Sequence, residues 1–252
     1  MKRPLKTLER VLSKAGLGSR TEARRWVAAG RVKVNGKVVK DPDAWLDLER
    51  DRVAFDGKPL KKQKPVYLLL YKPKGYLATY RDPQGRATIY DLLPDEERYL
   101  FPVGRLDLDT SGLLILTNDT AFAERVTNPD YKVPKTYLVK ASRHLSDADL
   151  DRLRSGVELK DGPTAPAQVV RLREAGGKTV FEITITEGRN RQVRRMVEAL
   201  EARVLKLVRT AIGPIRIGDL PIGKSRELTP DEVRILISRQ RPARSLRATP
   251  HP

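Results

Sequence analysis

Apolar runs typical of β-strands dominate the chain after Val66, and they outnumber the stretches with helical periodicity. The strand-like runs occupy residues 66–73, 113–116, 136–141, 179–186 and 204–217. Helices are expected at residues 119–127, 146–155 and 191–200, where a capping residue precedes the segment or apolar residues recur every three or four positions. Because strands and helices mostly do not alternate strictly, we expect an α+β domain built on a mainly antiparallel sheet.

The first sixty residues carry separate signals for two short helices and a β-hairpin. A helix over residues 8–16 is followed by the S-x-x-E pattern of Ser19 and Glu22, a capping box that should start a second helix. The Asn35-Gly36 pair then favours a type I′ turn between two short strands. This order of elements predicts a small N-terminal α/β module over residues 1–60.

The net charge is strongly positive and concentrated near the N-terminus. The chain has 50 Lys and Arg against 32 Asp and Glu, a formal charge of +18, and its first 40 residues hold twelve basic and two acidic side chains. Such a density favours a nucleic acid as partner over an anionic membrane face, although a solvated basic surface is the alternative for any single cation. The candidate phosphate-binding residues of this module are Arg20, Arg24, Arg25, Arg31 and Lys33.

The composition argues against several classes of site. There is no cysteine and there are only two histidines, so disulfides, thiolate metal sites and histidine-rich metal sites are not expected. No Gly-rich phosphate loop or dinucleotide fingerprint is present, so we expect no cofactor. No apolar run reaches the length of a bilayer span and no signal core follows the basic N-terminus, so we expect a cytoplasmic protein without a membrane partner.

Two polar segments flank the strand-rich region. The KKQKP stretch at residues 61–65 is expected to be a flexible linker, and the strand-rich domain should then extend over residues 66–238. Residues 239–252 are rich in arginine and proline and contain no acid. A basic, self-repelling segment of this kind is expected to be disordered.

Three short motifs could carry chemistry. GRLDLDTSG places Asp107 and Asp109 in a turn, although both could simply cap it. PKTYLV places Tyr137 in a strand, where ordinary packing is the alternative role. In EGRNRQVRRM the apolar residues form a core stripe on a helix, so the arginines lie on other faces as a solvated or a phosphate-binding set, with one turned inward to pair with an acid. The helix arginines are Arg191, Arg194 and Arg195, and Arg189, just before the helix, is a further candidate RNA-binding residue.

Taken in order, GRLD-x-D-T-S-G-L, K-T-Y-L-V and E-G-R-N-R-Q-V-R-R-M resemble the motif set of the bacterial rRNA pseudouridine synthases. SRTEARRWVAAGRVKVNGKVV resembles the alpha-L RNA-binding domain that this family carries at its N-terminus, which makes RNA the expected partner of the basic module. The resemblance runs from Leu5 to about Ile237 and implies a central, mainly antiparallel mixed sheet with a cleft across it. It also implies isomerisation of a specific uridine without a cofactor or a metal.

The resemblance assigns roles to individual residues. Asp107 matches the catalytic aspartate, which acts as a nucleophile or as a general base. Arg194 matches the basic residue that pairs with this acid, and Tyr137 matches the ring that stacks on the target base. Asp109 has no counterpart and is expected to shape the loop. Arg105 is expected to contact the RNA backbone or to hold the extruded nucleotide.

Two other functions fit parts of the pattern. A non-catalytic rRNA-binding assembly protein would explain the charge but not the joint presence of the three motifs, and a glycosylase would share base extrusion but release free uracil. Among synthases, the arginine motif and the basic tail are closer to the large-subunit branch, which acts on 23S rRNA, than to the small-subunit branch, which acts on 16S rRNA. We expect a monomer that acts on rRNA or on a ribosomal assembly intermediate.

Overall fold

The computed structural model describes residues 5–47, 49–60, 64–80, 82–93, 96 and 99–238. Part of the expected linker, residues 61–63, and the expected tail, residues 239–252, lie outside the described residues. The chain divides into two compact units. One unit comprises residues 1–66, 94–101 and 117–120, and the other comprises residues 67–93, 102–116 and 121–252.

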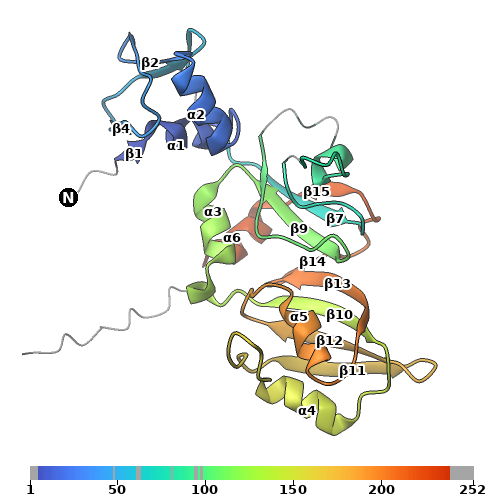
Figure 1. Cartoon of the computed structure of the whole chain (residues 1–252). Coiled ribbons are helices and arrows are strands. Elements are labelled where there is room, and N and C mark those ends of the chain that lie inside the picture. The colour runs from blue at the N-terminus through green and yellow to red at the C-terminus, as the bar shows by residue number, and fades with distance from the viewer. Residues whose placement is uncertain are drawn as a thin grey trace, which may run out of the picture. The chain divides into compact units, whose positions relative to one another are not determined.

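The N-terminal unit contains two helices and two small sheets (Figure 1). The helices are α1 (Leu8–Lys14) and α2 (Arg20–Ala28). One sheet pairs β1 (Lys6–Thr7) with β4 (Trp45–Leu46), and the other has the order β3-β2-β5-β6. Its strands are β2 (Val32–Val34), β3 (Lys37–Val38), β5 (Val53–Phe55) and β6 (Lys58–Pro59).

The local signals in this unit are confirmed. Ser19 caps α2 by accepting a hydrogen bond from the Glu22 amide, and the Glu22 carboxylate accepts one from the Ser19 amide in return. Asn35 and Gly36 have φ angles of 49° and 82°, which are the two positive values that a type I′ turn requires. Leucines and valines of both helices pack with those of β2 in a single core, which is why the short elements are stable together.

The larger unit is built on one nine-stranded sheet with the strand order β11-β12-β10-β13-β9-β7-β15, to which β14 adds beside β13 and β8 beside β9. The pairing of β13 with β9 is parallel, and the pairings of β10, β11, β12, β14 and β15 with their neighbours are antiparallel. The predicted α+β class and mainly antiparallel sheet are therefore confirmed. The strands are β7 (Tyr67–Lys72), β8 (Phe101–Pro102), β9 (Ser111–Thr117), β10 (Lys135–Ala141), β11 (Gln168–Glu174), β12 (Thr179–Ile185), β13 (Val204–Ile212), β14 (Ile215–Arg216) and β15 (Ser225–Glu227).

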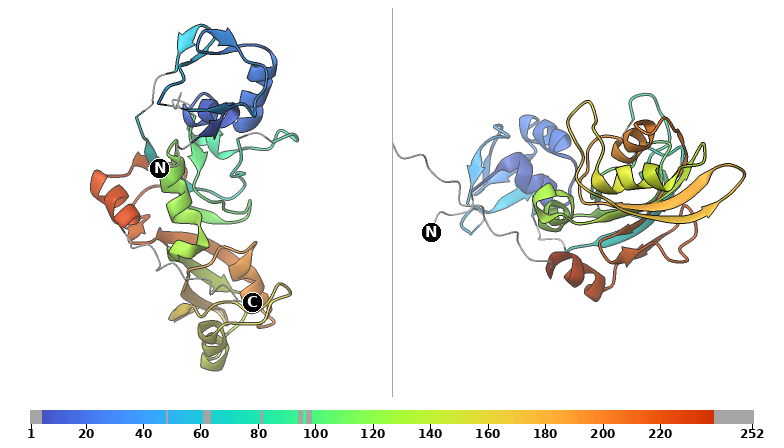
Figure 2. Two further views of the ribbon diagram at one scale, coloured as in Figure 1. Left: turned by 90° about the vertical axis from the view of Figure 1, so that its left-hand side faces the viewer. Right: turned by 90° about the horizontal axis from the view of Figure 1, so that it is seen from below.

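Helices cover the sheet in two groups, each with its own core. α4 (Asp147–Ser155) and α5 (Gln192–Glu198) pack with residues of β10 and β12 in one core. α3 (Thr120–Thr127) and α6 (Pro230–Ser238) pack with residues of β7 and β9 in the second. The right-hand view in Figure 2 shows α4 and α5 on one side of the sheet and α6 on the other. The sequence had not predicted α6, β11 or β15.

Candidate active site

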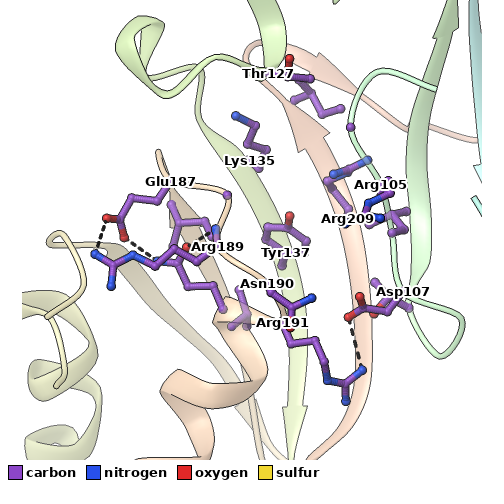
Figure 3. A pocket seen from close by; sticks show the side chains of 18 of the residues that line it. Arg105, Asp107, Thr127, Lys135, Tyr137, Glu187, Arg189, Asn190, Arg191 and Arg209 are labelled. Atoms are coloured by element: carbon purple, nitrogen blue, oxygen red, sulfur yellow. Dashed lines mark hydrogen bonds and ion pairs between the residues drawn. The ribbon is translucent and has the colours of Figure 1, made fainter. Parts of the chain in front are cut away.

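A pocket of about 300 Å³ lies where residues of the two cores of the larger unit meet (Figure 3). One wall is the loop of residues 103–110, which leads into β9. The opposite wall is the loop of residues 187–191 and the first turn of α5. β10 and β13 form the floor between them. The three motifs that the sequence singled out therefore converge on one cavity.

Asp107 begins the turn that ends the first wall. The Thr110 amide donates a hydrogen bond to the Asp107 carbonyl over 3.1 Å, which closes the turn immediately before β9 starts at Ser111. The Asp107 side chain is 34% exposed and lines the pocket, so its carboxylate is accessible to a substrate. Strand formation directly after the turn fixes the direction in which this carboxylate points.

Gly112 allows β9 to reach its parallel partner. It pairs with Arg209 of β13 and has a φ angle of +122°. A Cβ atom at this position would lie 2.3 Å from the Arg209 carbonyl oxygen and 2.4 Å from its amide nitrogen. Only glycine has both this backbone freedom and this small size. The close pairing that it allows joins the turn of Asp107 to β13 in the floor of the pocket.

Lys72, at the end of β7, holds the same turn from inside the protein. Its side chain is fully buried, and its ammonium group donates hydrogen bonds to the carbonyl oxygens of Asp107 at 3.1 Å and Thr110 at 2.9 Å. Burial lowers the pKa of Lys72 to about 8, and the Asp107 and Asp109 carboxylates offset part of this effect. The buried ammonium group of Lys72 therefore stabilises the turn.

Arg194 is the inward-turned arginine of α5, but its partners differ from those that the resemblance implied. Its side chain is 9% exposed, and its Nη2 atom lies 3.0 Å from the Asp109 carboxylate. The same atom donates to the Asp109 carbonyl and to the Thr110 hydroxyl. The described contacts thus pair Arg194 with Asp109 and not with Asp107. Asp109 shapes the loop, as expected, because it is the acid that fastens the turn to α5.

Arg191 supplies the cation that faces Asp107. Its Nη1 atom lies 3.5 Å from the Asp107 carboxylate and 3.3 Å from that of Asp109. Arg191 occupies the N-cap of α5 with a φ angle of +47°, a left-handed conformation that non-glycine residues rarely adopt. This conformation directs the guanidinium toward the facing loop, as Figure 3 shows. Because Arg191 is 43% exposed, a phosphate group could compete for it.

Tyr137 lies on the pocket floor between the walls, with its ring packed partly against the core under α4 and α5. Lys135 lies two residues earlier on β10 and therefore on the same face of the sheet. Arg209 reaches the pocket from β13, where its Nε atom donates to the Leu113 carbonyl over 2.7 Å. The floor thus combines one aromatic ring with two cations.

The remaining arginines predicted to bind RNA differ in the contacts they make within the protein, and of these Arg189 and Arg105 line the pocket whereas Arg195 does not. Arg189 donates to the carbonyls of Gly162 and Pro163 and to the Glu187 carboxylate. Arg195 forms a two-contact ion pair with Asp161 at 2.7 and 3.1 Å. These contacts secure the loop at residues 161–163, and RNA binding by either arginine stays a prediction. Arg105 is exposed at the pocket edge and has no recorded partner within the described part of the chain.

The five cations predicted for the N-terminal unit also fall into two groups. Three are paired with acids of the same unit, and the other two are exposed with no ion pair recorded among the described residues. The pairs are Arg20 with Glu9, Arg24 with Asp43 and Arg31 with Asp56, and the unpaired residues are Arg25 and Lys33. Arg25 and Lys33 are therefore the better placed phosphate ligands, and contact of all five with RNA stays a prediction.

Over the described ranges, no helix combines the length and the apolar character that a bilayer span requires. Within the same ranges, no three His, Asp or Glu side chains are grouped so that they could hold a metal ion.

Sequence reasoning missed three cations of the site. Lys72 precedes a proline at the end of an apolar run, and nothing local indicates which carbonyl groups it contacts. Arg209 interrupts the apolar pattern of its strand, which is a signal for a special role. Lys135 could have been found, because side chains two positions apart in a strand share a face and Tyr137 had already been singled out.

Comparison with known proteins identifies the family of the chain. A sequence model described as RNA pseudouridylate synthase matches residues 66–199, and an S4 domain model matches residues 7–44. An uncharacterized RNA pseudouridine synthase of Aquifex aeolicus is 44% identical over 227 residues, which cover 90% of this chain and 91% of that protein. The ribosomal large subunit pseudouridine synthase B of Bacillus subtilis is 39% identical over 234 residues, with 92% and 96% covered.

A solved structure agrees with the sequence comparisons. A crystal structure of a pseudouridylate synthase superposes with a TM-score of 0.66 at 31% identity, over 91% of this chain and 99% of that one. The two family models match residues 7–44 and 66–199, and the second range includes both walls of the pocket and Tyr137. The chain therefore belongs to the RNA pseudouridylate synthase family and carries an S4 domain at its N-terminus.

Proposed function

We propose that this enzyme isomerises one uridine of large-subunit rRNA to pseudouridine, with Asp107 as the reactive carboxylate. The observation that carries the proposal is the position of Asp107: its accessible carboxylate lines the pocket that Tyr137 also lines, while the turn behind it is held by Lys72 and Arg194. A carboxylate fixed in this way can attack the sugar or remove a proton from it without reorganising first.

The charge of the protein fits an RNA substrate whose target base must leave the stack. Extrusion of a base costs a few kcal/mol, which contacts to phosphates and stacking on an aromatic ring can offset. We infer that Tyr137 stacks on the extruded uracil and that Arg105 and Arg191 contact the adjacent backbone. The unpaired Arg25 and Lys33 of the N-terminal unit would add further contacts to RNA phosphates.

The choice of 23S rRNA is supported by the similarity to the Bacillus subtilis large-subunit synthase. Pseudouridylation of 16S rRNA is the alternative. An rRNA or a ribosomal assembly intermediate as substrate would require the enzyme to act in the cytoplasm, where ribosomes are made. A monomer would suffice, because residues of a single chain line the described pocket.

The test is incubation of the purified protein with unmodified 23S rRNA and, separately, 16S rRNA, followed by carbodiimide modification and primer extension. We expect a new stop in 23S rRNA, no stop with Asp107→Asn, and a retained though weaker stop with the matched control Asp109→Asn. A stop in 16S rRNA alone would move the enzyme to the small-subunit branch. Full activity of Asp107→Asn would remove Asp107 from the chemistry, and release of free uracil would indicate a glycosylase.

A further inference from the structure

Lys135 is a partly buried ammonium group in the pocket without a counter-charge. Among the described residues, no hydrogen bond or ion pair of its side chain is recorded. The other charged or titratable groups lining this pocket are Asp107 and Glu187, Tyr137, and the arginines 105, 189, 191 and 209. Glu187 is already bound by Arg189 and Gln192, and Asp107 faces Arg191. An uncompensated cation in such a place is costly unless a ligand brings an acceptor.

Arg209, which lies near Lys135, is a second buried cation without a counter-charge among the described residues. It is 4% exposed, its Nε atom is used by the Leu113 carbonyl, and its buried Nη2 atom has no hydrogen-bond partner in the part of the chain that the structure describes. Burial, and next the charge of Arg209, lower the pKa of Lys135 to about 8. Buried polar groups are nearly always hydrogen-bonded in a complete site. The buried Arg209 charge adds to that of the unpaired Lys135, so this end of the pocket favours electron-rich oxygen atoms of the substrate.

The order of the side chains along the pocket identifies the part of the substrate concerned. Figure 3 shows Tyr137 between Asp107 and Lys135. If Asp107 meets the ribose and Tyr137 stacks on the base, as the proposed function holds, then Lys135 meets the edge of the ring opposite the glycosidic bond. In uracil, C4 lies opposite N1 and carries the carbonyl oxygen O4. The exposed arginines at the pocket edge are better placed for phosphate groups, which stay on the RNA backbone.

We propose that the Lys135 ammonium group donates a hydrogen bond to O4 of the extruded uracil. This inference rests on the proposed function, because it takes the position of the base from the roles of Asp107 and Tyr137. Lys135 is then a catalytic and specificity-determining residue that touches the substrate. Arg209 completes the electropositive floor beneath the base.

The contact acts at the step in which the base departs. The C1′–N1 bond breaks and its electron pair stays on the uracil, where the negative charge spreads over N1, O2 and O4. The base turns, C5 forms the new bond to C1′, the proton on C5 is lost to a base and N1 takes up a proton, so no atom is gained or lost. A cation at O4 stabilises the departing base, and does so more strongly in a desolvated pocket than in water. The benefit is the same whether Asp107 acts as a nucleophile or as a base.

The same contact selects uridine over cytidine. Cytosine carries an amino group at C4, which presents a hydrogen-bond donor where uracil presents an acceptor. A cytidine in the pocket would place that donor against the Lys135 ammonium group and leave both unpaired. Sites built around a specific hydrogen bond reject analogues that cannot make it much more strongly than apolar pockets do.

Binding of free uridine and cytidine, followed by ligand-detected NMR, tests the contact without turnover. The proteins are the wild type, Lys135→Met, Lys135→Arg and the control Lys140→Met, which alters the opposite face of β10. We expect the wild type and the control to prefer uridine by about tenfold, and Lys135→Met to lose the preference. Equal affinity of the wild type for both nucleosides, or an unchanged preference in Lys135→Met, would overturn the proposal. If Lys135→Met lost affinity only for uridine monophosphate and inorganic phosphate, the proposal would also be overturned, because Lys135 would then bind a phosphate group.

Single-turnover kinetics on the mapped rRNA test the role in catalysis. We expect Lys135→Met to lower the rate of glycosidic bond cleavage by about 100-fold at nearly unchanged RNA affinity. The loss should be smaller on RNA with 5-fluorouridine at the target, because the fluorine makes uracil a better leaving group. In the wild type kcat/KM should fall above about pH 8, as Lys135 and also Lys72 lose their protons. Lys135→Arg should lose less activity there, because only Lys72 then titrates in this range. A rate that rises with pH through this range would instead make Lys135 a general base. If the wild type were inactive on every rRNA, the proposed function would be contradicted. The preference for uridine over cytidine in the binding experiment would then still test the contact of Lys135 with O4.

Discussion

Replacement of Gly112 by alanine should destabilise the enzyme at the point where the turn that carries Asp107 enters the sheet. The added Cβ would lie 2.3 Å from the Arg209 carbonyl oxygen and 2.4 Å from its amide nitrogen, both of which are main-chain atoms that cannot rotate away. β9 and β13 would have to move apart by about 1 Å to restore an ordinary contact of about 3.5 Å. This displacement would disturb both the turn of Asp107 and the Arg209 side chain.

The expected magnitude has two parts. Alanine at a φ angle of +122° is strained by about 1–3 kcal/mol. Forcing a methyl group into a closely packed site costs about 1–3 kcal/mol more. The free energy of unfolding should therefore fall by about 2–6 kcal/mol, which corresponds to a decrease in Tm of roughly 5–20 °C for a unit of this size.

Thermal and urea denaturation of the full chain measure this change. Gly85→Ala is the matched control, because Gly85 also has a positive φ angle, +70°, but no heavy atom lies within 4 Å of the added Cβ. Gly85→Ala should show only the strain component. If Gly112→Ala were no less stable than Gly85→Ala, the close approach of β9 and β13 would not be a constraint and the reasoning would be refuted.

Three further variants test the supports of the site and the RNA-binding surface. Arg194→Met should reduce kcat at least tenfold and the free energy of unfolding by about 1–3 kcal/mol, because Asp109 loses its contacts with α5. Arg194→Lys should not restore the activity, and full rescue by lysine would contradict a geometric role for the guanidinium. Lys72→Met should flatten the pH dependence of stability measured by urea denaturation. Its lowered pKa means that the unfolded chain binds more protons between about pH 8 and 10.5, so stability in the wild type should rise with pH across that interval. Arg25→Gln should reduce the slope of log RNA affinity against log salt concentration by about 0.7–0.9. Arg24→Gln should change this slope less, because the Arg24 side chain is already paired with Asp43. Equal effects of the two variants would show that the intramolecular ion pair does not limit RNA binding.

Features fixed by neighbouring residues were predictable from the sequence. The capping box of α2 needs only Ser19 and Glu22, and the hairpin turn needs only Asn35 and Gly36, so both could be read directly. The strands β7, β10, β12 and β13 were found because each contains a long apolar or alternating run. β15 is only three residues long, and its apolar content is too low to identify a strand.

The partners of charged residues were less predictable because they depend on contacts between distant segments. Helical spacing places the arginines of α5 away from the apolar stripe, so the inward turn of one of them was expected only from the functional interpretation of the motif, and its partner could not be predicted. Asp107 and Asp109 are two residues apart, and the conformation of the turn decides that Asp109 faces Arg194. The left-handed conformation of Arg191, which brings it to Asp107, is likewise set by the loop as a whole.

The parallel pairing of β9 with β13 has a consequence for the order in which the enzyme becomes functional. It joins residues far apart in the chain, as the contact between Ser111 and Leu207 shows, which spans 96 positions. Contacts of such long range form slowly, because a large loop must close before they stabilise the chain. During synthesis the N-terminal unit emerges early and its short-range elements can form at once, whereas the pocket cannot close until β13 has been made. A nascent chain could therefore hold RNA well before it could modify it.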